Sequence, residues 1–132
     1  MRELRPKGIE INIDDKPRRL LFTLNAIDEL QEEYELPIPE IIAKVFDTDA
    51  GKLEAYKHLK KIITTLLNND VEIHNEENPG DKWEFVTERY VGNRLTIDNI
   101  GIISGAMLIA FTRSFPKKHE DDDDDPNRKS GR

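Results

Sequence analysis

The chain opens with apolar residues that alternate with polar ones, which is the period of a half-buried strand. Ile9, Ile11 and Ile13 set this pattern. The segment from Asp14 to Pro17 has turn chemistry, and a second extended run follows from Arg19 to Phe22. We therefore predict a small β-hairpin. It needs a further surface to pack on, because two strands alone are marginally stable in water.

From residue 24 the apolar spacing becomes that of amphipathic helices. Thr23 or Asn25 is suited to cap the first helix, and Pro37 separates it from a second. The break from Asp47 to Gly51 separates the second from a longer third helix. The three apolar stripes are Leu24, Ile27, Leu30 and Tyr34; Ile38, Ile41, Ile42, Val45 and Phe46; and Leu53, Tyr56, Leu59, Ile63, Leu66 and Leu67.

The next segment, from Asn68 to Lys82, is rich in asparagine and other turn formers. We predict that it is mostly a loop. Beyond it, Trp83, Val86 and Tyr90 have the spacing of a short fourth helix, although the part from Trp83 to Val86 also fits a strand.

A last helix is predicted from Ile97 to Phe111, with Thr96 as its cap. It is apolar on most faces, so we expect it to lie at the centre of the domain, surrounded by the other helices. Gly101 and Gly105 lie four residues apart, which permits close approach of another helix. That helix belongs either to a second copy of the chain or to the same monomer. The amount of apolar surface favours self-association through this helix.

From Lys117 onward the chain has no apolar residue to bury, and Asp121 to Asp125 form an unbroken acidic run. Such a segment is expected to stay disordered. The predicted fold is mainly α, an N-terminal hairpin followed by a compact bundle of about four to five helices. We divide the chain into a flexible N-terminus (1–8), a single domain (9–116) and a disordered acidic tail (117–132).

The amino-acid composition argues against several classes of function. The 132 residues are 36% hydrophobic and 36% charged, with a formal net charge of -7. This balance argues against binding of nucleic acid, which needs a basic face. No cysteine is present, so a disulfide framework or a thiolate site is excluded. The longest apolar stretch, Ile100 to Phe111, is too short to span a membrane. Because Met1 to Gly8 precedes no apolar run, we expect no signal peptide and a cytoplasmic protein.

The sequence shows little that points to catalysis. It lacks a glycine-rich phosphate loop and a recognisable nucleophile–base pair. His58 and His74 have no metal-ligand spacing and are predicted at the surface, and five consecutive aspartates lack the geometry of a calcium loop. We therefore expect a non-enzymatic protein with no metal and no cofactor.

Aromatic and small residues in the second half of the domain are the candidate contact residues. Aromatic side chains are enriched in interface hot spots, although they more often belong to the core. Both readings stay open for Trp83, Phe85 and Tyr90. The candidate interface residues are Trp83, Tyr90, Gly101, Gly105, Met107 and Phe111.

The run from Leu21 to Glu32 reads Leu-Phe-Thr-Leu-Asn-Ala-Ile-Asp-Glu-Leu-Gln-Glu. With its flanks, residues 20–34, it resembles the small tail assembly chaperones of long-tailed bacteriophages and prophages. These proteins often begin with a short hairpin and continue into a phrase of this kind and a helical remainder. The aspartate run departs from that pattern.

The resemblance implies a non-enzymatic chaperone in the cytoplasm of a bacterial host cell. Its partners would be the tape-measure protein, which is long, helical and prone to aggregate, and the tail-tube protein that assembles around it. The alternative is an acidic regulator or inhibitor that mimics nucleic acid and binds a basic partner. That alternative rests on the net charge of -7 and on the aspartates of the tail.

Overall fold

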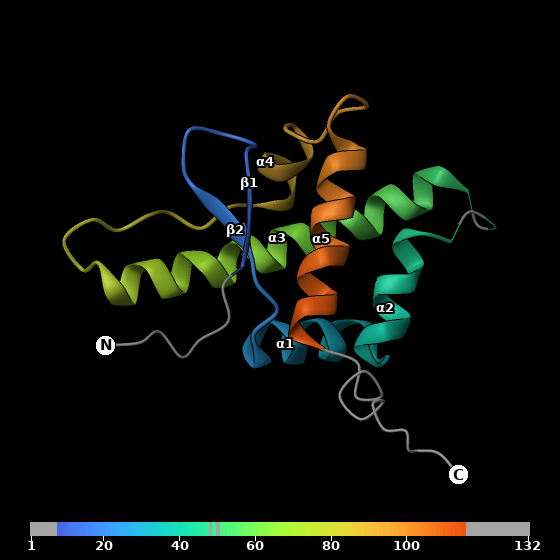
Figure 1. Cartoon of the computed structure of the whole chain (residues 1–132), viewed down its shortest axis with the longest axis horizontal. Coiled ribbons are helices and arrows are strands. Elements are labelled where there is room, and N and C mark those ends of the chain that lie inside the picture. Colours follow the sequence, from blue (N-terminus) through green and yellow to red (C-terminus); the bar gives the residue numbers. More distant parts are fainter. Residues whose placement is uncertain (1–7, 48, 50, 116–132) are drawn as a thin grey trace, which may run out of the picture.

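The computed structural model describes residues 8–47, 49 and 51–115. Within them it contains a two-stranded hairpin followed by five helices, so the predicted mainly helical class is confirmed (Figure 1). The predicted flexible N-terminus, except Gly8, and the predicted tail lie outside the described residues. The elements are β1 (Ile9–Ile11), β2 (Arg18–Leu20), α1 (Leu24–Tyr34), α2 (Ile38–Val45), α3 (Lys52–Glu77), α4 (Glu88–Gly92) and α5 (Ile100–Ser114).

The hairpin is antiparallel and lies between two helices. Its register pairs Ile9 with Leu20 and Ile11 with Arg18. β2 packs against α3, whereas β1 packs against α5, which crosses the molecule in front of α3 (Figure 1). This arrangement supplies the surface that two short strands need for stability.

Local signals set the first two helices as predicted. The Thr23 hydroxyl caps α1 by accepting a hydrogen bond from the amide of Ala26 at 3.1 Å. Pro37 is the N-cap residue of α2. The amide of Ile38 donates to Oε1 of Gln31 at 2.9 Å, which links the start of α2 to the end of α1.

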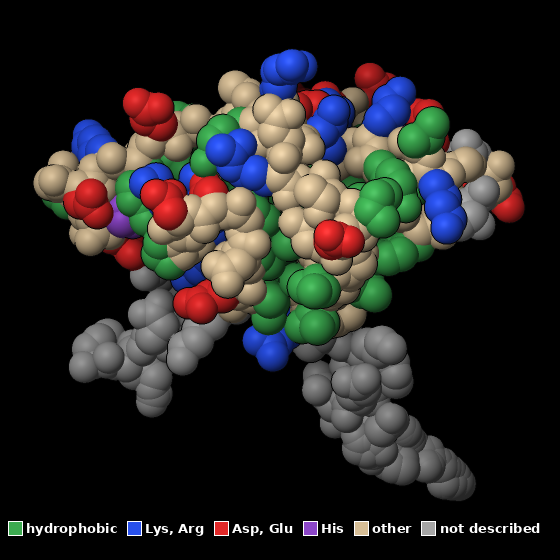
Figure 2. Space-filling view, turned by 90° about the horizontal axis from the view of Figure 1, so that it is seen from above, with side chains coloured by type: hydrophobic (Ala, Val, Ile, Leu, Met, Phe, Trp, Pro, Cys, Tyr) green, Lys and Arg blue, Asp and Glu red, His purple; other side chains and the backbone are tan. Residues whose placement is uncertain are grey.

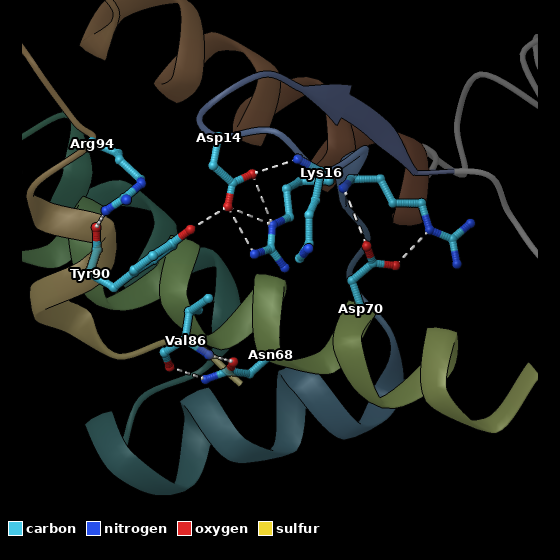
Figure 3. A network of polar contacts seen from close by, with 9 residues as sticks. Asp14, Lys16, Asn68, Asp70, Val86, Tyr90 and Arg94 are labelled. Carbon is cyan, nitrogen blue, oxygen red and sulfur yellow. Dashed lines mark hydrogen bonds and ion pairs between the residues drawn. The ribbon is translucent and has the colours of Figure 1, made fainter. Parts of the chain in front are cut away.

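α3 is the central helix of this fold and has 26 residues. It packs against α1, α2, α4 and β2. The predicted loop from Asn68 to Lys82 is wrong for its first ten residues, because α3 continues to Glu77. Its third quarter remains inside the molecule, where Val71 is fully buried and Asp70 binds Arg19 of β2 through Oδ1 and Nε at 2.8 Å (Figure 3).

The prediction that the last helix lies at the centre is also wrong. α5 covers the hairpin from outside and buries only one stripe, formed by Ile103, Met107 and Ala110. The helix begins at Ile100, with Asn99 rather than Thr96 in the N-cap position. The apolar residues of a helix do not by themselves determine how many elements pack on it. In this fold the hairpin covers a single face of α5.

The ends of the predicted stripes also depart from expectation. The spacing predicts buried positions for Leu24, Leu53 and Phe46, but their exposed fractions are 79%, 79% and 47%. Each lies in the first turn of a helix or just beyond its last turn, at the margin of the core. The predicted fourth helix is reduced to α4, because Trp83 to Val86 is extended without a strand partner.

Candidate functional site

One candidate contact surface is the solvent-facing side of α5. Ile102, Leu108 and Ile109 are 73%, 40% and 48% exposed and lie on the side opposite the buried stripe. Together with Gly101 and Gly105 we call them the α5 outer face. Figure 2 looks onto the end of the molecule at which α5 begins and shows apolar side chains gathered around it. Scattered apolar residues are normal on a surface, but a continuous strip along one helix is typical of an interaction site.

The two glycines of this face do not pack tightly within the monomer. A Cβ atom added at Gly101 or Gly105 would meet no atom within 4 Å. Of the two readings of this spacing, internal helix packing is therefore not what the structure shows. The face is left smooth and open at both positions.

The other candidate residues of α5 belong largely to the core. Met107 is fully buried, so it cannot contact a partner, and its assignment to an interface is wrong. Phe111 is half-buried, and its ring meets Phe22 edge-on at 5.6 Å and Phe115 at 4.9 Å. The contact with Phe22 packs the last turns of α5 against the segment between β2 and α1.

An apolar groove adjoins the beginning of the α5 outer face. It has a volume of about 590 Å³ and receives side chains from α3 and from the turn before α5. Leu53 and Ile97 are 79% and 80% exposed at its walls. The groove extends the apolar surface beyond α5 itself.

Trp83 and Tyr90 lie in a different region, near the hairpin turn. The Tyr90 hydroxyl donates to Oδ2 of Asp14 at 2.6 Å, and Arg18 reaches the same carboxylate through Nη2 at 2.9 Å (Figure 3). Burial alone raises the pKa of Asp14, but hydrogen bonds from Arg18, Tyr90 and the Lys16 amide outweigh it and lower this pKa to about 2. The hydrogen bond to Asp14 raises the pKa of Tyr90. The cluster therefore stays ionised at Asp14 and neutral at Tyr90 around neutral pH.

Trp83 is held from two sides. Its ring stacks on His74 with centroids 3.7 Å apart and planes 12° apart. Its backbone amide donates to Oδ1 of Asn75 at 2.8 Å, and its carbonyl accepts from Nδ2 of Asn75 at 3.1 Å. Tyr90 in turn packs under Arg94, whose guanidinium carbon lies 3.6 Å from the ring centroid. Neither aromatic is a freely exposed anchor.

The histidines are less exposed than predicted. His58 is half-buried, and its Nδ1 lies 2.6 Å from the Tyr34 hydroxyl in a hydrogen bond. Burial, followed by the nearby charge of Lys44, lowers the pKa of His58. His74 is half-buried beneath Trp83. Both serve packing, and among the described residues no group of three His, Asp or Glu side chains is placed to hold a metal ion.

Sequence reasoning missed the asparagines that position the extended segment. Asn68 and Asn75 lie seven residues apart, two helical turns, and so share one face of α3. This spacing is the available signal, but the asparagine-rich composition of the segment predicts a loop. The pattern from Asp14 to Pro17 predicts an ordinary turn and gives no sign that Asp14 would hold Arg18, which is only 2% exposed.

No family model, no curated protein and no solved structure matches this chain. Among the described residues, none of the helices combines the length and the apolarity that crossing a bilayer requires.

Proposed function

We propose that this protein is a non-enzymatic tail assembly chaperone of a phage or prophage. In this role it holds a helical segment of the tape-measure protein while tail-tube subunits assemble around that protein in the host cytoplasm. The resemblance of residues 20–34 supports the proposal. The observation that carries it is the α5 outer face, an apolar helix side that no described element covers.

The dimensions of this face suit a helical client. α5 has 15 residues and is therefore about 22 Å long, or about four turns. Its only charged residue is Arg113, near its end. A client helix can therefore lay an apolar stripe along α5 without burying an unpaired charge. The small residues Gly101 and Gly105 let the two backbones approach closely at the start of the helix.

Co-expression with the neighbouring long tail gene tests the proposal. We expect the two polypeptides to co-purify and the tape-measure protein to become more soluble. The double substitution Ile102→Glu and Ile109→Glu should abolish both effects, because it places charges on the α5 outer face. Phe46→Glu, at an exposed apolar position at the end of α2, is the matched control and should preserve them. Absence of both effects with the unmodified chain would end the proposal.

A second copy of the chain is the competing occupant of this face. The mass of the isolated protein in solution decides between them. A monomer at high concentration would exclude self-association and leave the face free for the client. An oligomer that the client does not dissociate would count against the proposal.

A second candidate function is that of an acidic inhibitor that occupies a nucleic-acid-binding groove. The acidic residues that would support this function are not confined to the tail. Residues 8–115 contain 20 Asp and Glu against 12 Lys and Arg, and exposed acids follow one another along α1. Competition with DNA for a basic partner, weakened by salt, would favour this function over the chaperone role.

A further inference from the structure

A second hollow, of about 430 Å³, lies between the hairpin turn and the segment after α3. We call it the Trp83 pocket. Three of its lining residues are cationic, although the chain as a whole is acidic. The lining residues that matter for its chemistry are Lys16, Arg18, Lys82, Trp83, Glu84 and Phe85.

Arg18 supplies the decisive observation. Its side chain is 2% exposed, and Asp14 accepts hydrogen bonds from its Nε at 3.3 Å and its Nη2 at 2.9 Å. Nη1 is buried and has no hydrogen-bond partner in the described part of the chain. Buried donors are nearly always paired, and a charged one left unpaired is costly. A guanidinium that lines a pocket and keeps one donor free is suited to an acceptor brought by a ligand.

Two further cations reinforce this preference. The ammonium of Lys16 lies 5.7 Å from the centroid of Trp83, and the guanidinium carbon of Arg18 lies 5.4 Å from it. Neither Lys16 nor Lys82 has an ion-pair partner among the described residues. Glu84 is the only acidic residue in the lining. It opposes a dianionic phosphate more strongly than a singly charged carboxylate.

The remaining walls are largely aromatic. Trp83 is fixed by His74 and Asn75, and Phe85 is 59% exposed. An aromatic wall that stays exposed beside cations suits a ligand with an apolar group next to its negative charge. The volume accommodates two adjacent side chains but not a folded element.

We propose that the Trp83 pocket binds a segment of a partner protein in which an acidic residue adjoins an apolar one. The carboxylate lies toward Arg18, Lys16 and Lys82, and the apolar side chain lies against Phe85. The chain's own tail fits this description less well, because its acidic residues adjoin only His119 and Pro126 and no larger apolar side chain. This site is separate from the α5 outer face and stands independently of the chaperone role.

Trp83 is the only tryptophan of the chain, so its fluorescence reports on the pocket. The probe is a blocked peptide, acetyl-Gly-Phe-Asp-Gly-amide, titrated into the full-length protein, with the Asn peptide in place of Asp as the charge control. We expect a saturable change with the Asp peptide and at least about tenfold weaker binding of the Asn peptide. Lys16→Gln and Lys82→Gln should each weaken binding by about two- to fivefold, the worth of an exposed ion pair. Lys57→Gln, a lysine of the groove near Leu53, should have no effect.

Several outcomes would overturn the proposal. They are no saturable change at millimolar peptide, equal binding of the Asn peptide, or equal losses with Lys57→Gln. Inorganic phosphate binding more tightly than the Asp peptide would assign the pocket to another anion. Replacing Asp121 to Asp125 with Asn in the full chain should leave peptide affinity unchanged, and a gain would show that the tail competes for the pocket.

Discussion

Asn68 meets the backbone of Val86 with both atoms of its side-chain amide. Oδ1 accepts from the amide of Val86 at 2.7 Å, and Nδ2 donates to its carbonyl at 2.9 Å (Figure 3). Asn75 makes the same pair of hydrogen bonds with Trp83. Two turns of α3 thus hold an extended segment that has no strand to pair with. The Trp83 pocket depends on this attachment, because residues 83–87 form one of its walls.

Loss of either asparagine should destabilise the protein. Asn68→Ala and Asn75→Ala each leave two backbone groups unpaired, so we expect each to reduce the free energy of unfolding by about 1–3 kcal/mol. Asn68→Asp should be at least as harmful, because it keeps the acceptor, removes the donor and places a carboxylate against the carbonyl of Val86. Denaturant unfolding measures these changes. Asn25→Ala, an exposed position of α1, is the control.

The hydrogen bonds of Asp14 with Arg18 and Tyr90 should make the free energy of unfolding decrease in acid. The pKa of Asp14 is about 2 in the folded chain against an ordinary value of 3.8, so its contribution is fully present above pH 3.8 and is lost as the pH falls toward 2. The shift corresponds to about 2 kcal/mol. Unfolding free energies of the unmodified chain and of Asp14→Asn should differ above pH 4 and converge by pH 2. A constant difference across this range would contradict the assignment.

His58 should make stability fall in mildly acidic solution. Its pKa is lowered by burial, so the folded chain favours the neutral imidazole and protonation favours unfolding. The contribution is present above the ordinary pKa of 6.5 and decreases as the pH falls below it. His58→Gln should remove this part of the pH dependence between pH 7.5 and 5. An unchanged slope in that variant would locate the dependence elsewhere.

The glycines of α5 should be replaceable. Because an added Cβ at Gly101 or Gly105 meets open space, substitution by Ala should raise the free energy of unfolding by about 0.5–1 kcal/mol through helix propensity alone. Gly51 is the opposite case, because its φ of 99° is unfavourable for any residue with a side chain, and Gly51→Ala should be destabilising. If Gly101→Ala or Gly105→Ala instead destabilises the isolated chain, the added methyl group meets protein atoms and this face of α5 is not open to solvent.

Alanine substitutions at the consecutive residues Ile102 and Ile103 should distinguish a side chain that packs in the core from one that contacts a client. Ile103 is 2% exposed, and Ile103→Ala should cost about 2–4 kcal/mol of unfolding free energy. Ile102 is 73% exposed, and Ile102→Ala should change it by less than about 0.5 kcal/mol while weakening binding to a client. A large loss of stability from Ile102→Ala at low protein concentration would show that this side chain is already covered.

The sequence by itself determined the elements whose signals are local. The alternation around Ile9 and Ile11 predicted the hairpin, Thr23 predicted the start of α1, and Pro37 predicted the boundary with α2. These signals work because a cap or a proline acts on the backbone next to it, and because the apolar period follows directly from strand or helix geometry.

Only the tertiary structure decided which helix is central and which surfaces stay open. Asn68 and Asn75 look like loop formers until the backbone of Trp83 to Val86 satisfies their amides, and then α3 runs on through them. The apolar residues of α5 have the pattern of a core helix, but in the structure the hairpin covers only one side of this helix. Arg18 is buried because Asp14 and Trp83 meet around it, from positions up to 65 residues away in sequence. Burial and hydrogen-bond satisfaction depend on neighbours that are distant along the chain, and local periodicity carries no information about them.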